Sequence, residues 1–339
     1  MKKKLLSIFL ATTTVLMLVG CGSNKQAQGA NSNDKTEKVV RIGFPGTQNF
    51  IGGVSGVAQE KKYIDNELEK VGYKVEYKPF AAAGPAVNEA LTANEIDIAI
   101  YADFPGILSK SKGVETSLIG IADNDITSAI IVKVDSPIKN VKDLKGKKIG
   151  FTKGTYMQKY LYQVLDANGI AQSDVELINT NNDVDSALQG GSIDAVVVTD
   201  TQEAIDVFDK KIARTIDTSK DNPNFTAQSV IVGNSKFLAE NKEAGVALFK
   251  GLKEAKTLMQ QQPDEAYDVL TKSGLDKDTT KKLYGKDNDK FDYISLEVDD
   301  AAKKKIDDGK KFMIDNKLIS KDFDSDKWID NSFYYEANK

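Results

Sequence analysis

Residues 90–103 read ALTANEIDIAIYAD, and residues 187–200 read ALQGGSIDAVVVTD. The two stretches have the same length and share five residues at matching places: Ala90/Ala187, Leu91/Leu188, Ile96/Ile193, Asp97/Asp194 and Asp103/Asp200. Each stretch has the pattern of a short helix, a buried β-strand and an acidic residue before the next helix. The repetition predicts two lobes that are built alike, although a buried strand after a short helix can produce such a match by itself.

A second correspondence precedes the first one in both halves of the chain. Residues 42–44 (IGF), followed by Gly46-Thr47, match residues 149–151 (IGF), followed by Gly154-Thr155. Around these matches, strand-like runs alternate with helical patterns. This alternation predicts an α/β fold with parallel sheets that carry helices on both faces.

The expected strands are 39–44, 73–80, 96–101 and 116–122 in the first half and 147–151, 175–179 and 195–198 in the second. The expected helices are 54–72, 85–92, 104–111, 155–168, 184–189 and 201–210, with further helices in the tail at 242–261, 263–270 and 299–316. The apolar runs 128–132 and 227–232 are expected to cross between the lobes. Lobe 1 is therefore predicted to comprise residues 39–127 and 233–339, and lobe 2 residues 128–232.

The first 20 residues have the pattern of an export signal. A basic start, MKKK, precedes an apolar run that is too short for a membrane span and ends at Leu18-Val19-Gly20-Cys21. This tetrapeptide resembles a bacterial lipobox, which makes Cys21 the predicted lipidation site; a secretory signal with an unrelated Cys is the alternative. The polar residues that follow, up to 38, indicate a flexible tether. The predicted location is extracytoplasmic, with the lipid on Cys21 as the anchor to the cell membrane.

The composition argues against several classes of function. Lys and Arg number 46 against 50 Asp and Glu, with no basic patch, so no nucleic-acid partner is expected. The chain has no His and one Cys, so the common general bases and thiol nucleophiles of enzymes are missing. No metal is expected, since no ligand cluster has metal-binding spacing, and no cofactor is expected. The only arginines are Arg41 and Arg214, which favours ligand recognition by amides and hydroxyls.

In open α/β sheets, ligands bind beyond the carboxyl ends of the strands, close to helix N-termini. The candidate ligand-binding residues are those that follow the predicted strands or flank the first crossing: Gln48, Asn49, Phe50, Gly84, Asp103, Phe104, Thr127, Ser128, Gly154, Thr155, Tyr156 and Asp200. Gly154 and Thr155 suit an oxyanion, or they form an ordinary turn with a Thr cap. Asp103 and Asp200 either cap the helices that follow them or pair with a ligand amine, and the two roles are compatible.

The export signal, the two predicted lobes and the run DSPI…DLKGKKIG at 135–150 resemble the solute-binding proteins of bacterial ABC importers. The most similar branch binds aliphatic sulfonates, taurine and nitrate. Residues 102–105 (ADFP) are similar to its G-D-x-P motif, and Thr199-Asp200-Thr201 stands where sulfonate binders often carry W-D-P.

The resemblance covers about residues 39–255. It implies a type II periplasmic-binding-protein fold, in which two crossover segments join two doubly wound sheets. It also implies a monomer that captures a small anionic or zwitterionic ligand, an organic oxyanion, and delivers it to an ABC permease. The alternative is a phosphonate or a nitrogenous ligand, such as a thiamine-precursor pyrimidine, recognised by aromatic stacking. The absence of the Trp of W-D-P argues against this alternative, whereas four aromatic residues support it: Tyr101, Phe104, Tyr156 and Phe225. An enzyme on the same fold is less favoured.

Overall fold

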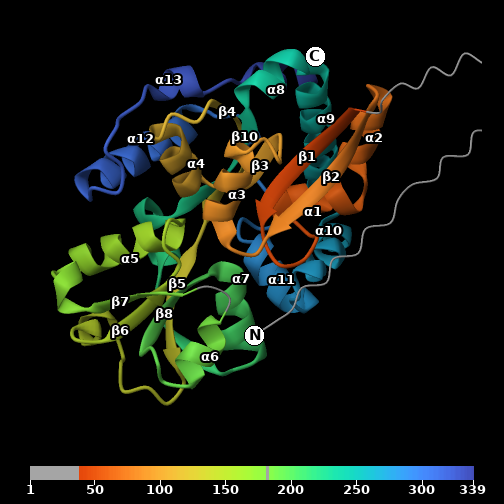
Figure 1. Cartoon of the computed structure of the whole chain (residues 1–339). Helices are drawn as coiled ribbons and strands as arrows, with labels where there is room; N and C mark the ends of the chain where they lie inside the picture. Colours follow the sequence, from red (N-terminus) through yellow and green to blue (C-terminus); the bar gives the residue numbers. More distant parts are fainter. Residues whose placement is uncertain (1–37, 181–182) are drawn as a thin grey trace, which may run out of the picture. The chain divides into compact units, whose positions relative to one another are not determined.

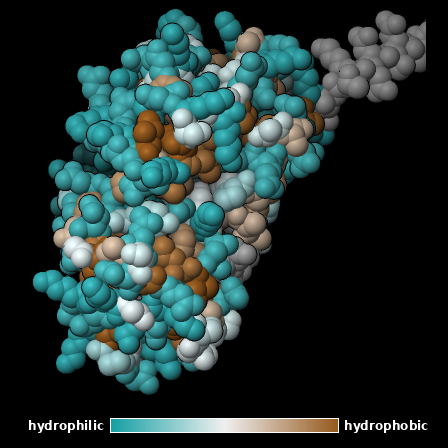
Figure 2. Space-filling view, turned by 60° about the vertical axis from the view of Figure 1, so that its left-hand side comes forward, coloured by the Kyte–Doolittle hydropathy of each residue, from teal (hydrophilic) through white to brown (hydrophobic). Residues whose placement is uncertain are grey.

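The computed structural model describes residues 38–180 and 183–339. Cys21, the predicted signal and nearly all of the predicted tether lie outside the described residues. Within the described part, no helix combines the length and the apolar character that a membrane crossing requires. Hydrophilic residues cover most of the face shown in Figure 2 and surround several apolar patches.

Two five-stranded sheets form the framework (Figure 1). The first has the order β2-β1-β3-β10-β4, with β1 Lys38–Pro45, β2 Tyr73–Phe80, β3 Ile98–Ala102, β4 Thr116–Ile126 and β10 Ala227–Asn234. The second has the order β7-β6-β8-β5-β9, with β5 Ser128–Lys133, β6 Lys148–Phe151, β7 Glu176–Asn179, β8 Ala195–Thr199 and β9 Ala213–Thr218. The matching orders confirm the α/β class and two sheets built alike.

The expectation of purely parallel sheets is wrong, because the fourth strand of each sheet is antiparallel to both of its neighbours. In the second sheet this strand is β5, which begins two residues after the end of β4 in the first sheet. Two neighbouring strands run parallel when a crossover helix carries the chain back across the sheet between them. β5 enters directly from β4 without such a helix, so it can run antiparallel to its neighbours. The edge strand β9, which has the sequence ARTIDT and contains only two apolar residues, was not predicted.

The helices are α1 Gly53–Glu60, α2 Tyr63–Lys70, α3 Ala83–Thr92, α4 Asp103–Ser111, α5 Tyr156–Ala167, α6 Val184–Gln189, α7 Asp200–Glu203, α8 Ser235–Glu240, α9 Lys242–Gln261, α10 Pro263–Leu270, α11 Lys277–Tyr284, α12 Asp300–Asp315, α13 Ser325–Trp328 and α14 Ser332–Ala337. The helix predicted at 54–72 is two helices, because Lys62 adopts a left-handed conformation with φ 58°. The helix predicted at 201–210 changes after Glu203 into a π-helical segment, Ala204–Asp209.

The strand β10 pairs with β3 and β4 of the first sheet. Its residues Val230 and Ile231 are fully buried in the two hydrophobic clusters of that sheet. The predicted lobe boundary at 232 therefore falls inside a strand of the first sheet, whereas the last strand of the second sheet ends at Thr218. We propose that lobe 1 comprises residues 38–126 and 227–339 and that lobe 2 is built on 128–218.

The repeated Gly and Ile residues are two sides of one packing contact. A Cβ atom on Gly43 would lie 2.4 Å from Cδ1 of Ile96, and one on Gly150 would lie 2.8 Å from Cδ1 of Ile193. Both distances are shorter than real Cβ contacts, so the Ile side chain fits only against glycine. The two sequence correspondences therefore reflect the same Gly–Ile packing contact in each sheet.

The repeated Asp residues also have matching structural roles. Oδ2 of Asp97 accepts a hydrogen bond from the backbone N–H of Arg41, and Oδ2 of Asp194 accepts one from Lys148, each at 2.8 Å. Asp97 is buried and also accepts hydrogen bonds from the Arg41 guanidinium at 2.9 and 2.7 Å. No such side-chain partner is found for Asp194 within 38–180 and 183–339.

Alanine substitution of these two residues is expected to have unequal effects. Asp97→Ala should lower the free energy of unfolding by about 3 kcal/mol, because it also leaves the Arg41 guanidinium without its charged partner. Asp194→Ala should lower it by about 1 kcal/mol, the contribution of one hydrogen bond. Urea denaturation followed by circular dichroism measures both, and equal losses would contradict the difference in roles.

Candidate functional site

A cavity of about 310 Å³ lies between the two sheets and is lined by residues from both halves of the chain. The first sheet contributes residues at the carboxyl ends of β1, β3 and β4, and the second contributes Thr199 at the carboxyl end of β8. This is the position at which α/β sheets bind ligands. The volume lies at the lower end of the range for small-molecule sites, which suits a solute of a few heavy atoms.

Three helices begin at the cavity, and none has a side-chain cap. The cavity is lined by Gly53–Ser55 at the start of α1, by Ala83 and Gly84 at the start of α3, and by Tyr156 and Met157 at the start of α5. The amides of an uncapped first turn carry partial positive charge and can donate hydrogen bonds to an anion. The α1 and α3 termini belong to the segment that builds the first sheet, and the α5 terminus follows β6 of the second sheet.

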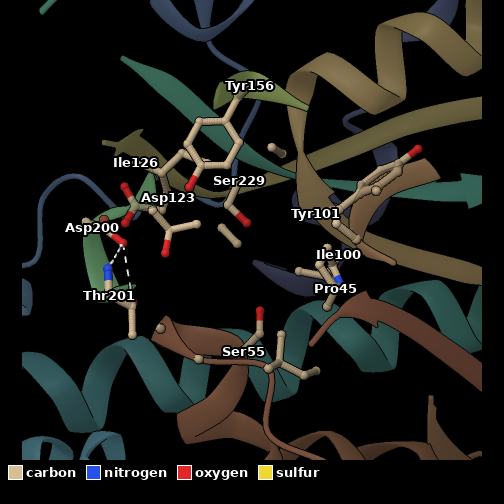
Figure 3. A pocket seen from close by; sticks show the side chains of 18 of the residues that line it. Pro45, Ser55, Ile100, Tyr101, Asp123, Ile126, Tyr156, Asp200, Thr201 and Ser229 are labelled. Atoms are coloured by element: carbon tan, nitrogen blue, oxygen red, sulfur yellow. Dashed lines mark hydrogen bonds between the residues drawn. The ribbon is translucent and has the colours of Figure 1, made fainter. Parts of the chain in front are cut away.

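The hydroxyl of Ser55 is the clearest unused polar group at this end of the cavity. Ser55 is 1% exposed, and its Oγ has no hydrogen-bond partner. Figure 3 shows the hydroxyl directed into the cavity from α1. A buried hydroxyl without a partner is costly, so a ligand oxygen is a natural partner for it.

Two carboxylates, Asp123 and Asp200, lie together at another side of the cavity (Figure 3). Asp200 accepts hydrogen bonds at Oδ1 from the backbone N–H of Thr201 at 2.7 Å and from its hydroxyl at 3.3 Å. Asp123 accepts at Oδ1 from the backbone N–H of Asp125 at 2.7 Å and from Lys286 Nζ at 3.4 Å. Both carboxylates therefore have one oxygen engaged by the protein.

Burial raises the pKa of Asp123 from 3.8 to about 6, the positive charge of Lys286 opposes this rise, and the charge of Asp200 adds to it. Burial also raises the pKa of the Tyr156 and Tyr284 hydroxyls, and the nearby carboxylates raise it further. Both tyrosines thus keep their protons and can donate hydrogen bonds into the cavity.

The raised pKa of Asp123 predicts a change of stability with pH. Ionisation of this carboxyl opposes folding above the folded-state pKa of about 6, and this cost disappears below the unfolded value of 3.8. Asp123→Asn should therefore stabilise the ligand-free protein at about pH 8 by on the order of 3 kcal/mol, and by nearly nothing at about pH 3.5. Urea denaturation at both pH values tests this, and an equal effect at both would contradict it.

Four of the predicted ligand-binding residues line the cavity: Gly84, Thr155, Tyr156 and Asp200. Asp103 is not part of the lining; it is 1% exposed, its Oδ2 accepts a hydrogen bond from the backbone N–H of Gln228, and its Oδ1 has no partner. Phe104 is buried in a hydrophobic cluster of the first sheet. Thr127 and Ser128 are buried where β4 leads into β5.

The other predicted residues lie outside the cavity lining. Gln48 and Asn49 are exposed, and the ring of Phe50 packs against Gly56. Gly154 has φ 79° and donates its N–H to Oε1 of Gln158 at 2.8 Å. These residues belong to the loops that connect β1 with α1 and β6 with α5.

The capping interpretations are wrong for the two Asp residues and for Thr155. The N-cap of α7 is Thr199, whose hydroxyl accepts a hydrogen bond from the N–H of Gln202 at 3.1 Å, and the N-cap of α4 is Ala102. Thr155 is the N-cap residue of α5, but its hydroxyl donates to the carbonyl of Thr152 at 2.7 Å and caps no amide. Asp200, like the first turn of α5, is thus available to a ligand.

Sequence reasoning missed Ser55, Asp123 and Tyr284, all of which line the cavity. Asp123 follows the apolar run of residues 118–122, so the criterion that selected Asp103 and Asp200 applied to it as well. No local signal marks Tyr284, because tertiary packing alone brings the C-terminal end of α11 to the cavity.

Comparison with known proteins places this architecture in a family. Residues 54–266 match the family model described as NMT1/THI5 like. The chain belongs to the NMT1/THI5-like family. It is 28% identical, over 99% of its length and 97% of the relative's, to a Bacillus subtilis protein named as an aliphatic sulfonates-binding protein.

Two solved structures show the fold. The periplasmic aliphatic sulphonate binding protein SsuA of Escherichia coli superposes with a TM-score of 0.67 at 22% identity, covering 88% of this chain and 99% of that one. The desulfurization enzyme DSZB superposes with a TM-score of 0.70 at 15% identity, covering 89% and 99%. The predicted type II periplasmic-binding-protein fold is confirmed, and this fold supports both binding proteins and an enzyme.

Proposed function

We propose that this protein is an extracytoplasmic solute-binding lipoprotein of an ABC importer, anchored through Cys21. In this proposal its two lobes enclose a small organic oxyanion of the sulfonate class and deliver it to a permease. The observation that carries the proposal is the convergence of three uncapped helix N-termini, from the segments that build both sheets, on one cavity. The name of the Bacillus subtilis relative supports the sulfonate class.

The chemistry of the cavity favours binding over catalysis. Amides and hydroxyls at the α1 and α5 termini can hold an oxyanion without transferring a proton, because their pKa values lie far from neutrality. The chain has no His, and its single Cys, Cys21, is the predicted lipidation site. We therefore propose that the solute leaves the protein chemically unchanged.

A thermal-shift screen of the purified full chain against alkanesulfonates, 2-aminoethanesulfonate, nitrate and alkylphosphonates tests the proposal. A ligand at about 100 times its dissociation constant should stabilise the protein by roughly 2.7 kcal/mol. Absence of a shift with every oxyanion in the panel would contradict the proposed function.

A matched pair of serine variants tests the oxyanion end of the cavity. Ser55→Ala should weaken binding of the oxyanion about tenfold, because one hydrogen bond to a charged group is lost. Ser109 is the control, since its Oγ is also buried without a partner but it lies on α4 outside the cavity lining. Isothermal titration calorimetry should show unchanged affinity for Ser109→Ala, and equal losses in the two variants would contradict the assignment of Ser55.

A further inference from the structure

We propose that Asp123 and Asp200 form a cation subsite, so that the ligand carries a positively charged nitrogen in addition to its oxyanion group. This inference rests on the proposed function and names the ligand class more narrowly. Asp123 belongs to β4 of the first sheet, and Asp200 follows β8 of the second. Figure 3 shows the two carboxylates next to each other at the cavity, so each half of the chain supplies one of them.

The two carboxylates repel each other, and a ligand cation would turn this repulsion into attraction. The two carboxylates lie side by side in Figure 3, and the charge of Asp200 adds to the raised pKa of Asp123. Like charges on facing lobes oppose closure of the cleft, whereas a cation between them favours closure. The arrangement thus makes closure depend on a positively charged ligand.

Protein cations compensate the carboxylates only in part. Lys286 lies 3.4 Å from Oδ1 of Asp123 and donates at 2.6 Å to the carbonyl of Asp125, whose own carboxylate lies 3.7 Å from Lys305. Among the residues described, no Lys or Arg lines the cavity, and none lies within 4.0 Å of the Asp200 carboxylate. The pair therefore keeps a net negative charge that faces the cavity.

One oxygen of each carboxylate remains available to a ligand. The hydrogen bonds from the protein reach Oδ1 of Asp200 and Oδ1 of Asp123, and the described part of the chain supplies no donor to either Oδ2 atom. An ammonium group has three donors and can bind two carboxylate oxygens at once. The aromatic ring of Tyr156, which Figure 3 places beside Asp123, adds a surface that attracts cations.

The hydroxyl of Ser55 is an independent sign that the same cavity receives a ligand. It is 1% exposed, has no partner and is directed into the cavity from α1 (Figure 3). The uncapped α1 terminus and Ser55 suit an oxyanion, whereas Asp123 and Asp200 suit a cation. A ligand that satisfies both ends is a short zwitterion, while a plain alkanesulfonate or nitrate would satisfy one end and be repelled by the other.

Isothermal titration calorimetry of the purified full chain at about pH 8 tests the inference with 2-aminoethanesulfonate, ethanesulfonate and ethanolamine as probes. The amine-bearing sulfonate should bind at least about 30 times more tightly than ethanesulfonate, because only its ammonium group is attracted by the carboxylates. Asp123→Asn and Asp200→Asn should each weaken its binding about tenfold or more and leave ethanesulfonate unaffected or improved. Asp166→Asn, an exposed change on α5, is the control and should leave both affinities unchanged.

The outcomes separate this inference from the proposed function. Equal affinity for the two sulfonates, or amine binding that neither Asn variant weakens, would overturn the cation subsite while the oxyanion function stands. Binding of ethanolamine that depends on Asp123 and Asp200, without binding of any sulfonate, would support the subsite and overturn the oxyanion function. Failure of both amine-bearing probes to bind would overturn the subsite.

Discussion

Asp200→Lys is expected to weaken binding of 2-aminoethanesulfonate by roughly 100-fold or more. Loss of one partner from a buried charge pair costs about 2–5 kcal/mol, and each 1.4 kcal/mol is a factor of about ten in affinity. The new lysine would also pair with Asp123 and occupy the place of the ligand cation. Isothermal titration calorimetry measures the loss.

The same variant should keep or raise the stability of the ligand-free protein. Lys at position 200 would replace a repulsion of Asp123 by an attraction, so the melting temperature should not fall even though binding is lost. Asp166→Lys, an exposed reversal of charge on α5, controls for the change in net charge and should bind normally. Retained affinity in Asp200→Lys would contradict a role for Asp200 in the site.

Gly251→Ala is expected to lower the free energy of unfolding by about 3 kcal/mol. A Cβ atom on Gly251 of α9 would lie 2.6 Å from the backbone nitrogen of Ile64 and 2.7 Å from its Cα, on α2. Because these are backbone atoms, the clash can be relieved only if the two helices separate. Helix separation would disturb the main cluster of the first sheet, in which Ile64 and Leu252 are fully buried.

Gly309→Ala is the matched control for this prediction. Gly309 is also a buried helical glycine, but its new Cβ would meet only the Cδ1 methyl of Ile107 at 3.3 Å and Nζ of Lys159 at 4.0 Å. Alanine favours the helix over glycine by about 1 kcal/mol, so this variant should be neutral or slightly stabilised. Urea denaturation of both variants tests the pair, and similar stabilities would contradict the close contact of α2 with α9.

Much of the framework could be predicted from the sequence because its signals are local. The strands around Ile42 and Ile149 are visible in the sequence as apolar runs. The residues that form the Gly–Ile contact and the Asp hydrogen bond occur at matching places in both sheets, so they appear as a sequence repeat. The break at Lys62 was missed because lysine carries no signal for a left-handed conformation. The strand β9 was missed because only one of its edges is paired, so it needs no continuous apolar run.

The site was predicted only in part, because it depends on how distant segments meet. Asp200 could be found because it follows a buried strand and stands at a recognisable motif position. Asp123 follows the predicted end of its strand at 122, as Asp200 follows its own strand, but no helix pattern comes after it, because β4 continues to Ile126 and carries the carboxylate within the strand. Tyr284 is brought to the cavity by tertiary packing of α11, which no pattern in residues 277–284 foretells.

Hydrogen–deuterium exchange of the full chain, with and without saturating 2-aminoethanesulfonate, tests most directly whether both halves hold one solute in this cavity. We predict slower exchange at the amides of Val54 and Ser55 on α1 and, in the same experiment, at those of Tyr156 and Met157 on α5. Protection confined to one of these two helices, or unchanged exchange at both, would contradict binding between the lobes.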